Sequence, residues 1–160
     1  MATTTAAPTQ SRIAGGSFLL ESRTCDEVFT PEDFNEQHKL IGQTTEEFAV
    51  NEILPQVEKM EHKDFSISRA LLKKAGDLGL SGAEIPEAYG GLGMDKVTAA
   101  VIADHIAKYA GFATTWGGHS GIGTLPIVYF GTEEQKRKYL PRLAAGTAGC
   151  SRVKPLTCNS

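Results

Sequence analysis

Apolar residues recur at helical spacing along most of the 160-residue chain, and no stretch shows the strict alternation of a half-buried strand. The spacing predicts about five helices. The fold class it indicates is all-α, with the short connections that are common in helical bundles. The predicted helices cover residues 31–54, 66–79, 95–109 and 112–130, with a fifth from 132 that gives way to a final turn after Pro141.

Residues that favour helix ends mark these boundaries. Thr30 and Pro31 are typical of a helix start, and Pro55 predicts a break or a kink at the other end of the first helix. Ser66 and Asp95 are the expected caps of the second and third helices, and Gly79 is expected to end the second. Thr132 and Gln135 have the spacing of a capping box.

The expected core follows from the same periodicity. The apolar positions on the predicted inner faces are Phe34, Ile41 and Phe48, then Ile67, Leu71, Ala75 and Leu78, and then Val97, Val101, Ile102 and Ile106.

The fourth predicted helix differs from the others because residues 112–130 are almost uncharged. A helix without a polar face is expected to be surrounded by protein. Its glycines lower helix propensity, so we expect them to let something approach the backbone closely. Two roles stay open at this point: a wall of an apolar ligand pocket, or close packing against another helix.

Charge and cysteine usage exclude several classes of function. Sixteen Lys and Arg against 19 Asp and Glu leave a net charge of −3, which disfavours nucleic-acid binding through a basic surface. No window approaches 18 consecutive apolar residues. Cys25, Cys150 and Cys158 are odd in number and far apart, which argues against a disulfide framework or a zinc site and favours a reducing compartment.

The remaining candidates for chemistry are weak. The loop GGLG at 90–93 lacks the motif and the preceding strand of a phosphate-binding loop. His105 and His119 have no ligand partners at metal spacing, so a structural role is the better interpretation. Cys150 and Cys158 have no general base in any visible motif.

Four segments in their order nevertheless resemble the N-terminal helical domain of the acyl-CoA dehydrogenase family. They are KKAGDLGLSGAEIPEAYGGLGM (73–94), TAAVIADHIAKYAG (98–111), HSGIGTLPI (119–127) and FGTEEQKRKYLPRLAAG (130–146).

The resemblance implies an FAD-dependent oxidation of an acyl-CoA to the trans-2-enoyl-CoA. In the family a glutamate removes the α proton, a hydride passes to the flavin, and an electron-transfer flavoprotein accepts the electrons. The full-length fold would add a β-domain and a C-terminal helical bundle, usually as a homo-oligomer. The implied substrate-binding positions in this chain are Tyr89, Gly90, Gly91, Thr115, Gly118 and His119. Glycine at 118 suggests room for a longer or branched acyl group.

The end of the chain departs from the family pattern. After Gly146 it reads TAGCSRVKPLTCNS, where relatives continue into the flavin-contacting segment, so no residue is assigned as catalytic base or flavin ligand. The expected organisation is an arm over 1–29 that is disordered or extended, the helical domain over 30–146, and an atypical tail over 147–160.

Three functional interpretations follow. The first is an acyl-CoA dehydrogenase that is incomplete and inactive alone. The second is a stand-alone helical module that binds a lipid or a partner. The third is a related flavoprotein oxidase. We expect a cytoplasmic location, with the mitochondrial matrix as the alternative.

Overall fold

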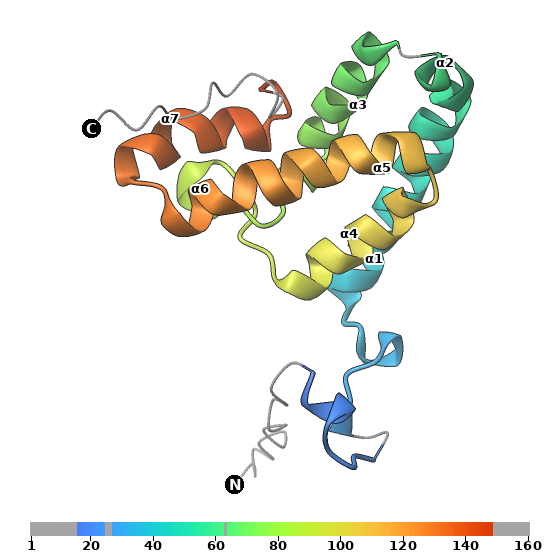
Figure 1. Cartoon of the computed structure of the whole chain (residues 1–160), viewed down its shortest axis with the longest axis vertical. Coiled ribbons are helices and arrows are strands. Elements are labelled where there is room, and N and C mark those ends of the chain that lie inside the picture. The colour runs from blue at the N-terminus through green and yellow to red at the C-terminus, as the bar shows by residue number, and fades with distance from the viewer. Residues whose placement is uncertain (1–15, 25–26, 63, 149–160) are drawn as a thin grey trace, which may run out of the picture. The chain divides into compact units, whose positions relative to one another are not determined.

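A computed structural model describes residues 16–24, 27–62 and 64–148. The chain divides into two units, Met1–Asn35 and Glu36–Ser160. Five helical runs and several single turns account for the regular structure of the described residues, and none of these residues lies in a strand (Figure 1). The all-α prediction is therefore confirmed.

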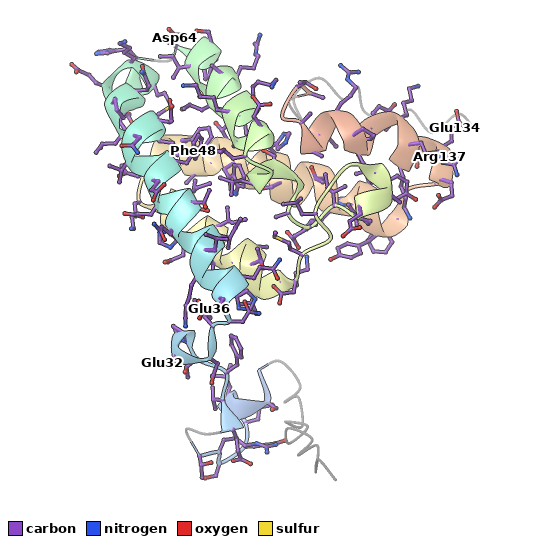
Figure 2. The ribbon with its side chains drawn as sticks, turned by 180° about the vertical axis from the view of Figure 1, so that it is seen from behind. Glu32, Glu36, Phe48, Asp64, Glu134 and Arg137 are labelled. Atoms are coloured by element: carbon purple, nitrogen blue, oxygen red, sulfur yellow. The ribbon has the colours of Figure 1, made fainter. Side chains whose placement is uncertain are left out.

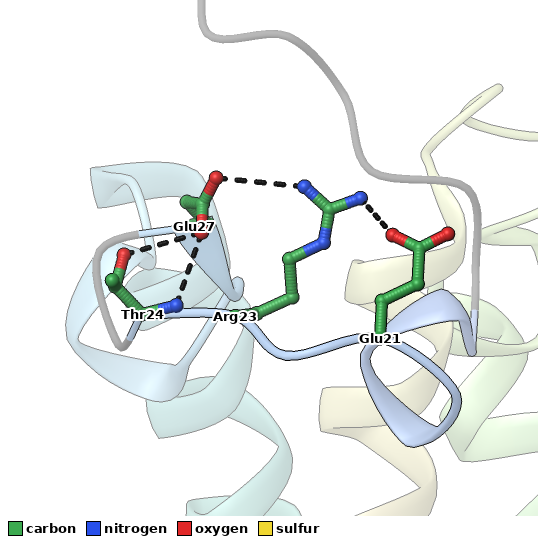
Figure 3. Close-up of polar contacts among 4 residues, drawn as sticks. All are labelled: Glu21, Arg23, Thr24 and Glu27. Carbon is green, nitrogen blue, oxygen red and sulfur yellow. Dashed lines mark hydrogen bonds and ion pairs between the residues drawn. The ribbon is translucent and has the colours of Figure 1, made fainter.

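The first unit contains two single turns in its described part, Ser17–Leu19 (η1) and Pro31–Asp33 (η3). Between them, the Glu27 carboxylate accepts the backbone N–H of Thr24 at 3.0 Å, and the Arg23 guanidinium contacts both Glu27 and Glu21 (Figure 3). Residues 1–15 and 25–26 lie outside the described residues, so a disordered or extended arm over 1–29 stays a prediction.

The predicted helix over 31–54 is wrong at its beginning. Thr30 does close a turn, because its N–H donates to the Asp33 carboxylate at 2.8 Å, but Phe34 is already extended. A single capped turn does not propagate without packing to support it. The helix starts again as α1, Glu36–Phe48.

The chain stays helical beyond Pro55, where a break was one of the expected outcomes. α1 is followed by the π-helical turn Ala49–Ile53 (η4), the 3₁₀ turn Leu54–Gln56 (η5) and α2, Val57–Glu61. A proline clashes with the carbonyl four residues earlier in a regular α-helix, and the change of helix type around Pro55 avoids that geometry.

α3 (Phe65–Asp77) is capped by Asp64 and not by Ser66: the Asp64 carboxylate accepts the Ser66 N–H at 3.0 Å. Gly79 follows the helix end with φ 79°, as its predicted role requires. Leu78 is 48% exposed because it lies past the last helical residue, whereas Leu72, which the pattern missed, is buried.

After α3 the chain forms η6 (Leu80–Gly82) and η7 (Glu87–Tyr89) and then enters α4, Lys96–Ala107. The cap predicted at Asp95 is confirmed, since its carboxylate accepts the Thr98 N–H at 2.8 Å. α4 lies beside α1 (Figure 1).

One long helical run crosses the second unit from α4 to α7. It comprises α5 (Ala110–Trp116), the π-helical segment Gly117–Thr124 (η8) and α6 (Leu125–Phe130). One aromatic contact joins its first part to α1: the Phe112 ring lies 6.4 Å from the Phe48 ring, centroid to centroid, and the same distance from the Trp116 ring within α5. Figure 2 labels Phe48 on the side of α1 that faces this run.

The prediction that this run is surrounded by protein is wrong for its second half. Ile122 and Phe130 are 83% and 88% exposed, and Tyr129 is also exposed. The described helices cover one side of the run only, so its uncharged character leaves an apolar surface.

α7 (Glu133–Ala144) begins with the predicted capping box: Gln135 accepts the Thr132 N–H at 2.9 Å, and its own N–H donates to Thr132 at 3.3 Å. The helix passes through Pro141, so the expected interruption there is wrong. Leu140 and Leu143 are buried against Ile85, while Glu134 and Arg137 are exposed on the outer side (Figure 2).

Candidate functional site

A pocket of about 170 Å³ lies in the second unit, between η6 with the residues that follow it, α4 and the α5–η8 run. Most of its lining is apolar, and several of the lining residues are small. The apolar lining residues are Leu80, Ala83, Ile85, Ala99, Ile102, Ala103 and Trp116, with Gly117 and Gly121; the polar ones are Ser81, Glu84, Ser120 and Thr124.

The hydroxyl groups around the pocket are directed into the protein. Ser120 donates to the Trp116 carbonyl at 2.8 Å, and Thr124 donates to the His119 carbonyl at 2.7 Å. The Ser81 hydroxyl is buried with no hydrogen-bond partner. Glu84 is ion-paired with Lys96, whose pKa is raised chiefly by this contact and by Tyr129. The surface that a ligand would meet is therefore mainly hydrocarbon.

The glycines of η8 contribute space and not close contact. A Cβ atom added at Gly117, Gly118 or Gly121 would meet no atom within 4 Å. No other part of the described protein packs against the backbone at these three positions. The sequence left open whether these glycines form a pocket wall or a close helix contact. Gly117 and Gly121 form part of a pocket wall.

The loop residues Tyr89, Gly90 and Gly91 form a tight turn. The Tyr89 hydroxyl donates to the Glu133 carboxylate at 2.7 Å, and this bond raises the pKa of Tyr89 and lowers that of Glu133. Gly90 has φ 82°, which favours glycine. A Cβ at Gly91 would lie 2.0 Å from the Ile85 carbonyl oxygen, so only glycine fits there without movement.

The backbone N–H groups of this loop are already used. The N–H groups of Gly90, Gly91 and Gly93 donate to the carbonyls of Glu87, Pro86 and Ile85, respectively. The N–H groups of Leu92 and Met94 donate to the carbonyls of Gly82 and Ala83. A phosphate cradle needs free N–H groups that point at the ligand. The loop is therefore a structural turn, as its sequence indicates.

Thr115 and Gly118 are partly exposed on the long run, whereas His119 is buried. The His119 Nε2 lies 3.0 Å from the Leu143 carbonyl, which only accepts, so Nε2 carries the hydrogen. Nδ1 is buried without a partner, and burial lowers the pKa of the ring, although the Leu143 carbonyl partly opposes this. The ring is neutral and joins η8 to α7.

The six implied substrate-binding residues thus fall into two groups, one in the loop after η7 and one on the α5–η8 run. None of the six lines the pocket described above. Their role in binding stays a prediction.

The other histidines with described contacts have structural partners. His38 contacts Asp95 at 3.1 Å and His105 contacts Glu46 at 2.7 Å; both pairs join α1 to α4 or its cap. The described residues contain no cluster of His, Cys, Asp or Glu suited to a metal ion. All three cysteines lie outside the part of the chain that the structure describes.

The pocket itself was not predicted, although the sequence carries a signal for it. Ala99 and Ala103 are four residues apart on α4, and Gly117 and Gly121 are four apart on the run that faces it. Small residues at helical spacing on two neighbouring helices leave room between them. Only the structure shows that these two pairs face each other.

The described residues therefore define a helical domain that walls a small apolar pocket. The family model for the N-terminal domain of acyl-CoA dehydrogenases matches residues 35–147, and the chain belongs to this family.

Known proteins that resemble the chain agree with this assignment. A probable acyl-CoA dehydrogenase of Bacillus subtilis is 52% identical over 132 residues, which are 82% of this chain and 22% of the relative. An acyl-CoA dehydrogenase from Bacillus anthracis, solved in complex with FAD, is 58% identical with a TM-score of 0.79, covering 84% of this chain and 23% of that one.

Butyryl-CoA dehydrogenase from Megasphaera elsdenii is 31% identical with a TM-score of 0.61, over 72% of this chain and 31% of that one. The chain thus spans about a quarter of the length of the Bacillus proteins it matches. Within the described residues, no helix has both the length and the apolar character needed to cross a membrane.

Proposed function

We propose that this chain supplies the N-terminal helical domain of an FAD-dependent acyl-CoA dehydrogenase and forms part of its acyl-binding pocket. The reaction is the oxidation of an acyl-CoA to the trans-2-enoyl-CoA. The observation that carries the proposal is the 58% identity, at a TM-score of 0.79, to the FAD-complexed acyl-CoA dehydrogenase of Bacillus anthracis.

In this proposal the acyl chain contacts the loop residues Tyr89, Gly90 and Gly91 and the helical residues Thr115, Gly118 and His119. The first group is held rigidly, because Gly91 is packed on Ile85 and Tyr89 is bonded to Glu133. Gly118 has open space around its α-carbon, which supports room for a bulky acyl group.

The described residues do not fit FAD by themselves. The glycine loop has no free N–H groups for a pyrophosphate, and a pocket near 170 Å³ is of the size that holds a benzene ring rather than a flavin with its adenine. Glu84 is the single carboxylate on the pocket lining, and its ion pair with Lys96 makes it a poor base. No redox or proton-transfer step is therefore assigned to the residues described here.

We expect the chain alone to bind flavin poorly and to be inactive. A complete enzyme would pass its electrons to an electron-transfer flavoprotein, act as a homo-oligomer and reside in the cytoplasm. The bacterial relatives support that location over a mitochondrial one.

A domain exchange tests the proposal. The segment of the Bacillus anthracis enzyme that matches residues 35–147 is replaced by this chain's own residues, and acyl-CoA-dependent reduction of an artificial electron acceptor is measured. We expect a flavin-loaded, active chimera. A folded chimera that holds FAD but oxidises no acyl-CoA from butyryl to palmitoyl would refute the proposal.

The exposed apolar residues Ile122, Tyr129 and Phe130 favour a second candidate, a stand-alone module that binds a partner or lipid through this surface. This alternative requires the purified chain to be monodisperse and to melt cooperatively. Light scattering and calorimetry on the 160-residue protein distinguish the two, because an aggregate or a non-cooperative melt excludes a stand-alone module.

A further inference from the structure

The pocket between α4 and η8 has no role in the proposed reaction, since none of the six implied acyl-binding residues lines it. We propose that it is a separate binding site for an uncharged, compact hydrocarbon group of about six carbons, branched or aromatic.

The size of the pocket sets the size of the ligand. Its volume of about 170 Å³ is similar to that of an engineered protein cavity, roughly 150 Å³, that binds benzene, although this pocket opens to solvent beside the exposed residues Ala103 and Gly117. A phenyl ring or a tert-butyl group fits within it.

The lining sets the chemistry of the ligand. Ala83, Ile102 and Trp116 present hydrocarbon, and the hydroxyls of Ser120 and Thr124 are already donated to backbone carbonyls. The Ser81 hydroxyl is buried with no hydrogen-bond partner. One buried hydroxyl cannot compensate for the desolvation of a charged ligand.

Glu84 is the charged residue of the pocket lining, and it affects which ligand charges the pocket accepts. Its side chain is only 18% exposed and is ion-paired with Lys96, whose ammonium also lies 5.2 Å from the centroid of the Tyr129 ring. The pair is mutually neutralised, so neither anions nor cations gain from entering. We therefore expect benzene or 2,2-dimethylpropane to bind and benzoate and benzylammonium to be rejected.

Small residues on both walls keep the pocket open. A methyl group placed on Gly121 of η8 would meet no atom within 4 Å, and Ala99 and Ala103 face this glycine from α4. A leucine at 121 or 103 would fill the space from opposite sides. Ala107, which lies outside the lining on the same helix as Ala103, provides a matched control.

The test uses the full 160-residue chain and needs neither flavin nor activity. Benzene is titrated into ¹⁵N-labelled protein, and amide shifts of η6, α4 and η8 are followed. We expect saturable shifts that centre on Ala99, Ala103 and Gly121. Gly121→Leu and Ala103→Leu should weaken binding at least tenfold, whereas Ala107→Leu should leave it within twofold.

Each result decides the proposal. No saturable shift in the wild-type protein overturns it, as does binding that survives both filling substitutions or benzoate binding as tightly as benzene. If one filling variant does not fold, the other wall supplies the answer. Failure of the domain-exchange experiment would leave these outcomes unchanged, because the two measurements share no step.

The pocket-filling variant Ala103→Leu in the Bacillus anthracis chimera tests whether the site is separate from the acyl site. We expect acyl selectivity to stay constant while benzene binding is lost. A shift of kcat/KM toward shorter unbranched acyl-CoAs would overturn the proposal, because the pocket would then hold the end of the acyl substrate.

Discussion

Gly91 provides the sharpest test of the packing described above, because it can be compared with its neighbour. In Gly91→Ala the new methyl would lie 2.0 Å from the Ile85 carbonyl oxygen and 2.5 Å from its Cβ. In Gly90→Ala the methyl meets nothing within 4 Å, and the cost is only that of the left-handed backbone at φ 82°.

The magnitudes follow from these two situations. Overpacking of a rigid site costs about 1–3 kcal/mol. Moving Ile85 also disturbs its carbonyl, which accepts the Gly93 N–H at 2.9 Å, and loss of that bond adds about 1 kcal/mol. We expect Gly91→Ala to lower the free energy of unfolding by about 3 kcal/mol, against about 1–2 kcal/mol for Gly90→Ala.

Urea unfolding followed by far-ultraviolet circular dichroism measures both variants at one temperature. If Gly91→Ala is unfolded without urea, the wild-type stability becomes a lower limit on its cost. Equal costs for the two variants, or a smaller cost for Gly91→Ala, would show that the loop relaxes freely and that the reasoning from contact distance is wrong.

Three further substitutions test other contacts. His119 has a lowered pKa, so its contribution to the free energy of unfolding is present above pH 6.5, the ordinary histidine pKa, and is lost as the pH falls through the folded-state pKa. In unfolding curves measured at several pH values, the free energy of unfolding of the wild type should fall by up to about 1.4 kcal/mol per pH unit relative to that of His119→Gln. Parallel pH dependences for the two proteins would contradict this. Asp95→Ala removes the α4 cap and the partner of His38, and thermal unfolding should show a loss of about 1–2 kcal/mol in stability. Asp95→Asn keeps an acceptor for the Thr98 N–H and should cost less. A larger cost for Asp95→Asn would exclude capping as the cause. Phe130→Ser should reduce self-association in light scattering while changing stability by less than about 0.5 kcal/mol, and a large loss of stability would show that this exposed ring packs in solution.

The parts of the fold that local chemistry decides were predictable from the sequence. The caps at Asp95 and Thr132 depend on side chains three residues from the N–H groups they bond, and both are confirmed. Asp64 was missed in favour of Ser66 because both residue types cap helices and only the backbone conformation distinguishes them. The turn at Thr30 was recognised, but its failure to continue into α1 depends on packing that spacing does not reveal.

The site was less predictable because it depends on residues far apart in the sequence. Periodicity shows that residues 112–130 lack charge, but it does not show which side other helices cover, and so the exposure of Ile122 was missed. The pocket needs Ala103 and Gly121 to face each other across two helices. The family resemblance gave the correct fold, whereas its six binding residues remain predictions.

The π-helical segment Gly117–Thr124 has a consequence for insertions and deletions. A π turn holds more residues than an α turn, so removing one residue here could convert the segment into regular α-helix without breaking the chain. Each residue of an α-helix advances the direction of the next by about 100°. A deletion inside a regular α-helix therefore turns everything that follows it, whereas a π turn that loses one residue still completes one rotation, so α6 and Phe130 would keep their present side. We infer that the chain tolerates the loss of one residue within Gly117–Thr124 better than the loss of one residue within α7.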